Sequence, residues 1–154
     1  MLMTLFAAAL AALGADPVAA ATAPAQRPAY AEGQVWEYRT RPQDAGSLVR
    51  IQKVELWPKG EHAAPIYHVS VVGLRFDAPQ LSAGAIEHLP VSRETLDASV
   101  TRLAADQSAS GFPSAEEGMA EWRAANGGVF TITLAEIVQL LESTVAGSAP
   151  AERS

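Results

Sequence analysis

The amino-acid sequence predicts an α+β domain in which an antiparallel sheet of three to four strands is covered on one face by two to three helices. Apolar–polar alternation is confined to the N-terminal half of this domain, whereas helical periodicity and helix-capping residues are confined to the C-terminal half. The 154-residue chain contains no cysteine. Its apolar core therefore has to stabilise it without disulfides.

Residues 1–23 are predicted to form a secretory signal peptide. Residues 2–13 are almost wholly apolar, and Ala21-Thr-Ala23 offers the small-x-small pattern that signal peptidase accepts. The apolar run is too short to cross a bilayer, and no cysteine is present to carry a lipid, so no stable membrane anchor is expected. The expected product is a soluble periplasmic or secreted protein.

One feature departs from the usual signal-peptide pattern. The first basic residue is Arg27, whereas signal peptides normally begin with lysine or arginine. A misplaced start codon would make the protein cytoplasmic instead. Residues 24–32, with Pro24 and Pro28, are expected to be an extended leader into a single domain at 33–145.

Three strands are expected in the first half of the domain. In 33–41, Trp36, Tyr38 and Thr40 alternate with charged residues, as in a half-buried strand. The apolar residues of 47–57 change phase, which predicts a β-bulge near Gln52-Lys53. With a third strand at 66–76, these runs predict an antiparallel meander.

The next segments are predicted from shorter patterns. The apolar stretch 85–89 is a candidate edge strand, which Pro90 is expected to stop. A helix capped by Ser92 is expected to follow, because Leu96, Val100 and Leu103 have the spacing of one helical face.

Two capping boxes predict two further helices, one from Ser114 with Glu117 and one from Thr133 with Glu136. Asn126-Gly-Gly128 is expected to close the first of them. Residues 129–132 between the two helices are either a short strand or an extended link. Residues 146–154 are small and polar and are expected to be a disordered tail.

Composition excludes several function classes. The net charge of −6 and the absence of Lys/Arg runs argue against nucleic acid or an anionic membrane as a partner. The absence of cysteine excludes thiolate catalysis, and neither Gly-x-Ser-x-Gly nor Ser-x-x-Lys occurs. No phosphate-cradling glycine motif is present either, and no cofactor is predicted.

The three histidines do not have metal-ligand spacing. His62, His68 and His88 would need a carboxylate such as Asp77 or Glu87 to be brought close by folding, so no metal site is predicted. A dyad of His88 with the nearby Ser92 is also not favoured, because helix capping accounts for that serine.

The remaining candidates are aromatic and basic side chains on the strands. Trp36, Tyr38 and Trp122 are expected to be core residues, whereas Trp57 beside Pro58 is expected to be exposed. Tryptophan and arginine dominate binding hot spots, so a sheet face carrying them is a candidate binding surface. The candidate residues for binding a ligand or partner are Trp57, Arg39, Arg41, Arg50, His68 and His88.

Three segments together resemble a family of small uncharacterised bacterial proteins. They are GQVWEYRTRP at 33–42, HLPVS at 88–92 and GVFTITLAE at 128–136. The resemblance spans most of the domain and implies a single domain from Gly33 to about Thr144. It implies no activity.

Two functional classes follow from these expectations. The first is a non-catalytic module that binds a protein or a small ligand through its sheet face or through a cleft between sheet and helix. The second is a small hydrolase that uses His68 or His88 with an acidic partner, which requires a pocket where a histidine meets a carboxylate within hydrogen-bond reach. A structural or stress-related role is the third possibility.

Overall fold

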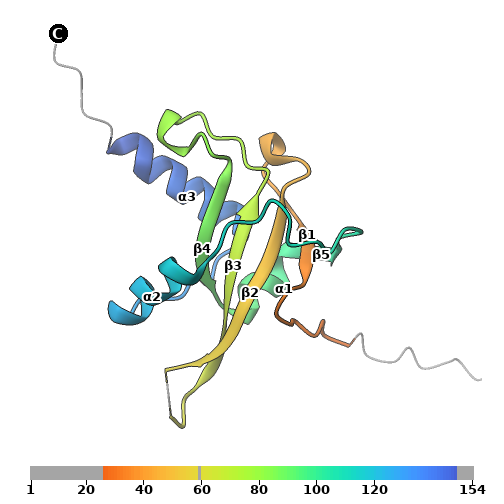
Figure 1. Ribbon diagram of the computed structural model, residues 1–154, viewed down its shortest axis with the longest axis vertical. Coiled ribbons are helices and arrows are strands. Elements are labelled where there is room, and N and C mark those ends of the chain that lie inside the picture. Colours follow the sequence, from red (N-terminus) through yellow and green to blue (C-terminus); the bar gives the residue numbers. More distant parts are fainter. Residues whose placement is uncertain (1–25, 59, 149–154) are drawn as a thin grey trace, which may run out of the picture.

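The computed structural model describes residues 26–58 and 60–148 (Figure 1). The predicted signal peptide at 1–23 lies outside the described residues, as does most of the predicted tail. Within the described ranges the elements follow in this order: β1 (Val35–Tyr38), η1 (Pro42–Asp44), β2 (Leu48–Trp57), β3 (Ala64–Val72), η2 (Pro79–Leu81), β4 (Ala85–Val91), α1 (Arg93–Ser99), β5 (Val100–Leu103), α2 (Glu116–Ala124) and α3 (Leu134–Gly147).

The strands form one antiparallel sheet in the order β4-β3-β2-β1-β5. The predicted α+β class is confirmed, with five strands rather than three to four. The meander of β1, β2 and β3 and the bulge of β2 between Ile51 and Lys53 are also confirmed. The stretch 85–89 belongs to edge strand β4, which continues through Pro90 to Val91.

The helix expected to carry Leu96, Val100 and Leu103 is shorter than predicted. Ser92 caps it as expected, but it ends at Ser99, and Val100–Leu103 forms β5 against β1. The β-branched Val100 and Thr101 suit a strand, and the free edge of β1 supplies their hydrogen-bond partners. Tertiary pairing therefore outweighs the local helical spacing here.

One of the two predicted capping boxes forms. Thr133 and Glu136 cap α3 reciprocally, with the Thr133 amide 2.9 Å from the Glu136 carboxylate. The predicted box of Ser114 with Glu117 is wrong, because α2 begins one residue later than that box requires. Ala115 is its N-cap, and the Ser114 hydroxyl accepts a hydrogen bond from the Glu116 amide instead.

The apolar core lies between the sheet and the helices α1 and α3. Tyr30 also packs into it, edge-on to Trp36 and Tyr67, so the packed structure begins before Gly33. Segment 129–132 forms only an isolated bridge, from Phe130 to Val91. The central core residues are Val49, Ile51, Val69, Val71, Leu96, Leu134, Ile137 and Val138.

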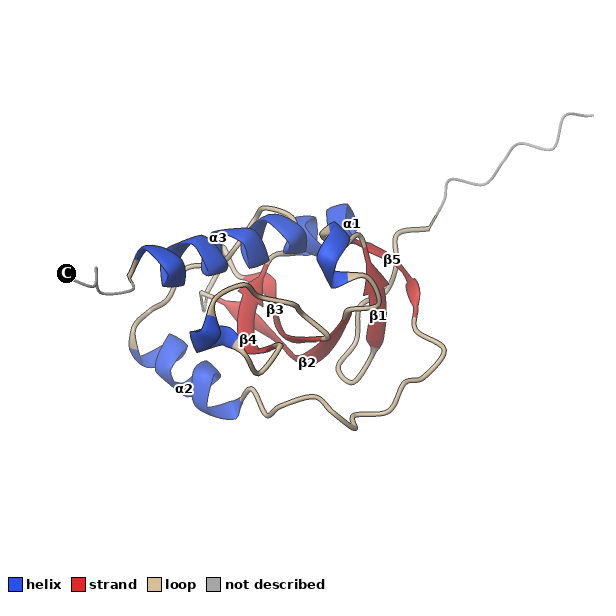
Figure 2. Ribbon diagram, turned by 90° about the horizontal axis from the view of Figure 1, so that it is seen from above, coloured by secondary structure: helices blue, strands red, loops and turns tan. Residues whose placement is uncertain are grey.

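The opposite face of the sheet is covered by α2 and the long segment that precedes it (Figure 2). Successive side chains of a strand point to opposite faces, so His68 and Ser70 of β3 point away from the core that Tyr67 and Val69 enter. The Gln52 amide bonds Ser70 and the carbonyl of Pro113. This second face is therefore polar, and it carries the candidate site.

Candidate functional site

Two β-bulges flank His68 and bring the site together. The pairing of β2 with β3 shifts between Ile51 and Lys53, and the pairing of β4 with β3 shifts between Ile86 and Leu89. The second shift places one extra residue in β4, at the position of Glu87 and His88. Bulges of this kind re-aim side chains, and here His88 turns onto the α2 side of the sheet beside His68.

A carboxylate and two imidazoles form a continuous hydrogen-bonded chain, the Glu55–His68–His88 relay. The Nε2 atom of His68 lies 2.8 Å from the Glu55 carboxylate, and its Nδ1 atom lies 2.8 Å from Nε2 of His88. The two rings stack with centroids 5.0 Å apart. His68 is fully buried, so both of its ring nitrogens depend on these two partners.

Arg123 of α2 holds the far end of the relay. Its guanidinium makes three contacts of 3.0 to 3.3 Å with the two oxygens of Glu55. Burial by itself raises the pKa of Glu55, but the hydrogen bonds from Arg123 and His68 outweigh burial and hold this pKa below its ordinary value. Glu55 is therefore ionised and only accepts hydrogen bonds.

Both histidines are neutral at pH 7. Burial lowers the pKa of His68, and Glu55 offsets only part of this effect. Burial, and then the proximity of His68 and Arg123, lowers the pKa of His88 to about 4.

Neutrality fixes the direction of every hydrogen bond in the relay. Because Glu55 only accepts hydrogen bonds, Nε2 of His68 carries the ring proton, and Nδ1 of His68 carries a lone pair and accepts. Nε2 of His88 then donates to that lone pair. The remaining ring nitrogen, Nδ1 of His88, is left as an acceptor.

That acceptor opens into a cleft of about 560 Å³ between β4 and α2, the His88 cleft. Within the described residues Nδ1 of His88 has no hydrogen-bond partner, and Nε of Arg50 is the one buried side-chain nitrogen or oxygen left unpaired. Nδ1 of His88 is thus not fully buried, although the α2 backbone lies close to it at Gly118, where an added Cβ would be 3.0 Å away. The cleft is lined by Ile86, Glu87, His88, Gly118, Glu121, Trp122, Ala125 and Gly127.

Trp122 joins the cleft to the relay. The centroid of its ring lies 4.9 Å from that of His68, in an edge-on contact, and 4.8 Å from that of Trp57. Its Nε1 donates a hydrogen bond of 2.8 Å to the carbonyl of Gly128. Gly127 permits this packing, because a Cβ there would lie 2.2 Å from the indole ring. The indole is therefore fixed in place.

Gly118 sets the distance between α2 and His88. A Cβ at this position would lie 2.6 Å from Cβ of His88, closer than two such carbons approach. Any larger residue would force the helix or the imidazole to move. The glycine thus permits the cleft wall to pack directly on His88.

The predicted site residues separate into two groups. Trp57, His68 and His88 gather around Trp122, with Trp57 half-buried rather than fully exposed. Arg39 is exposed and bonds the carbonyl of Ala98, well apart in the fold from this cluster. Arg50 is partly buried and donates to Gln52.

Arg41 lies in the interior rather than on the solvated sheet face expected from its odd-numbered position. Its guanidinium bonds Asp44 and Glu142, each at 2.5 Å, and stacks over Phe76. Burial in this network leaves it 7% exposed. Arg41 therefore ties η1 to α3 and is not available to a partner.

Sequence reasoning missed Glu55 and Arg123. The signal for Glu55 lay in the hairpin register: Lys53 pairs with His68 and Glu55 with Ile66, so Glu55 and His68 lie diagonally on one face. Predicting this contact from the sequence requires the exact position of the bulge in β2. Arg123 carries no comparable signal, because α2 is distant in sequence from β2.

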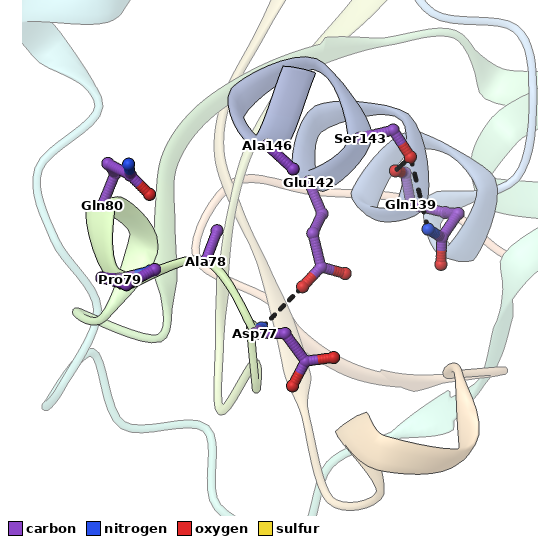
Figure 3. Close-up of a pocket in the computed structure, with 8 residues that line it drawn as sticks. All are labelled: Asp77, Ala78, Pro79, Gln80, Gln139, Glu142, Ser143 and Ala146. Carbon is purple, nitrogen blue, oxygen red and sulfur yellow. Dashed lines mark hydrogen bonds between the residues drawn. The ribbon is translucent and has the colours of Figure 1, made fainter. Parts of the chain in front are cut away.

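A second hollow, of about 470 Å³, lies between α3 and the turn η2 (Figure 3). The polar groups that α3 contributes to it are paired within the fold. Glu142 accepts from the Asp77 amide and from Arg41, and Gln139 bonds Ser143. These groups hold the fold together, so we place the candidate site at the His88 cleft.

Among residues 26–58 and 60–148, no group of three or more His, Asp or Glu side chains is arranged to hold a metal ion. The helices described there are all too short or too polar to cross a membrane. No protein-family model, curated protein or solved structure matches this chain.

Proposed function

We propose that this protein is a binding module that takes a small ligand in the His88 cleft. The observation that carries the proposal is the unpaired Nδ1 of His88, an acceptor whose orientation is fixed by the relay behind it. A ligand that donates a hydrogen bond to this atom meets a group already in its binding geometry. Such preorganisation lowers the entropic cost of binding.

The shape of the cleft supports the same proposal. Its volume of about 560 Å³ is in the range of small-molecule sites. Trp122 and Ala125 supply apolar surface, while His88, Glu87 and Glu121 supply polar contacts. A combination of apolar surface with a few convergent polar groups is typical of ligand pockets.

Hydrolysis is the second candidate, and the relay itself is the observation that favours it. A carboxylate that orients a histidine is the arrangement used in general-base catalysis, with His88 here taking a proton from water. Against it, general bases work best with a pKa near the operating pH, and that of His88 is about 4. We therefore place binding first.

A fragment screen by NMR tests the proposal. The full chain is labelled with ¹⁵N, and a library of small polar and charged fragments is scanned for shifts in the His88 ring and the Trp122 indole. We expect hits that are lost in His88→Ala and retained in His62→Ala, since His62 is exposed in the β2–β3 loop. A library with no hit that depends on His88 contradicts the proposal.

The same two variants separate binding from hydrolysis. Chromogenic esters and phosphoesters are incubated with the wild-type chain, His88→Ala and His62→Ala. Turnover that disappears only in His88→Ala would establish the second candidate in place of the first. We expect no turnover above background in any of the three.

A further inference from the structure

We propose that the ligand of the His88 cleft is an organic cation: a primary ammonium or guanidinium group on a short apolar chain. This inference rests on the proposed function and names its ligand class. It follows from three properties of the lining residues, namely their hydrogen-bonding capacity, their charge and their apolar surface.

The side chains that line the cleft offer acceptors and no free donor. Nδ1 of His88 is a lone pair, and the carboxylates of Glu87 and Glu121 only accept. The one side-chain donor in the lining is Nε1 of Trp122, and it is already bonded to the carbonyl of Gly128. A complementary ligand has to bring the donors, as an ammonium with three N–H bonds or a guanidinium with five does.

The negative charge of the lining favours a cationic hydrogen-bond donor over a neutral or anionic one. Glu87 and Glu121 are both exposed at the cleft, and no lysine or arginine is among the residues that line it. The neighbouring guanidinium, that of Arg123, is bound to Glu55 on the relay side. A cation therefore meets two carboxylates whose charge is not neutralised within the cleft, whereas an anion meets repulsion.

The apolar residues accommodate the rest of such a ligand. Trp122, which is 7% exposed, and Ala125 supply the apolar part of the lining, against which a short aliphatic chain can pack. A small, strongly hydrated inorganic cation would use none of this surface. The lining thus favours an organic cation over a metal ion.

Three isosteric probes test the ligand class: n-butylammonium, butan-1-ol and butyrate. Each is titrated at pH 7.5 into the full ¹⁵N-labelled chain, with the His88 ring nitrogens and the Trp122 indole as reporters. We expect n-butylammonium to bind at least tenfold more tightly than butan-1-ol, and butyrate to cause no shift at the cleft. Glu121→Gln should weaken n-butylammonium about fivefold, while Glu61→Gln, in the exposed β2–β3 loop, should leave its affinity unchanged.

The outcomes separate this inference from the proposed function. Equal or tighter binding of butan-1-ol or butyrate at the cleft overturns the cation inference and leaves the binding function standing. If n-butylammonium causes no shift but the fragment library gives hits, the cation inference is likewise overturned and the binding function stands. Absence of shifts with all three probes and with the library overturns both.

Discussion

Nδ1 of His68 and Nε2 of His88 lie 2.8 Å apart, although twenty residues separate them and they belong to different strands. The contact exists because β2 and β4 both bulge beside β3 at this level of the sheet. It makes the half-buried His88 the end of a relay that reaches the partly exposed Glu55–Arg123 ion pair. The predictions below test that relay, the packing around it and the network that holds α3.

Glu55→Gln is expected to destabilise the fold by about 1 to 3 kcal/mol, the range for leaving a charged partner unsatisfied. Glutamine still accepts from His68, but Arg123 loses its countercharge. Urea unfolding followed by tryptophan fluorescence measures the change. Glu61→Gln removes an exposed carboxylate that makes no hydrogen bond within the described residues, and it should shift stability by less than about 0.5 kcal/mol. Equal effects of the two variants would contradict the structural role of Glu55.

Gly118→Ala is expected to displace His88 or α2, because the new Cβ would lie 2.6 Å from that of His88. Overpacking of this kind costs about 1 to 3 kcal/mol, which the better helix propensity of alanine only partly offsets. Altered Trp122 fluorescence and a shifted His88 ring signal report the displacement. The matched control is Gly147→Ala in α3, where nothing lies within 4 Å of the added carbon. That variant should be neutral or slightly more stable.

Stability is expected to fall as the pH drops from about 6.5 toward 4. His68 and His88 have folded-state pKa values below the ordinary value of 6.5, so the unfolded chain binds more protons in this window. Their contribution is complete above pH 6.5 and is lost as the pH falls. We expect a loss on the order of 2 kcal/mol, after allowance for solvent screening of the partly exposed His88 ring.

Urea midpoints measured between pH 7.5 and 4.5 check this dependence. The slopes are compared above about pH 5.5, because glutamates, with an ordinary pKa of about 4.3, contribute little there. His88→Gln should flatten the curve, whereas His62→Gln should leave its slope unchanged, because His62 is exposed. Because His68 is still present in His88→Gln, part of the slope should remain. A slope that is undiminished in this variant would show that groups other than His88 cause it.

Arg41→Ala is expected to cost about 3 kcal/mol, because it strands two carboxylates in a buried network. Arg39→Ala removes an exposed arginine that bonds one backbone carbonyl and should cost about 0.5 kcal/mol or less. Thermal unfolding of the two variants gives the comparison. Similar losses from both would show that the interior network contributes no more than a surface contact.

Local patterns predicted much of the fold. The alternation around Trp36 and Tyr38 marks β1, the phase change at Gln52 marks the bulge of β2, and Thr133 with Glu136 marks the start of α3. Each depends on residues within a few positions of one another. The α+β class followed because strands precede helices along most of the chain.

Non-local pairing accounts for what was missed. β5 forms because β1 has a free edge, and this availability overrides the helical spacing of Val100 and Leu103. Predicting the relay requires the register of two bulged strand pairs and the position of α2 on the sheet. The sequence therefore indicated His68 and His88 as candidate site residues, but not Glu55 and Arg123. A single sequence does not specify a register to within one residue.

The Arg41–Glu142 ion pair joins residues 101 positions apart, and β5 pairs with β1 across more than 60 positions, from Tyr38 to Val100. Contacts this distant along the chain slow folding, because long loops have to close before the contacts form. During synthesis Arg41 can contact Asp44 and Arg75 early, but it cannot pair with Glu142 until α3 has left the ribosome. The contact between η1 and α3 therefore forms only after every strand of the sheet has been synthesised.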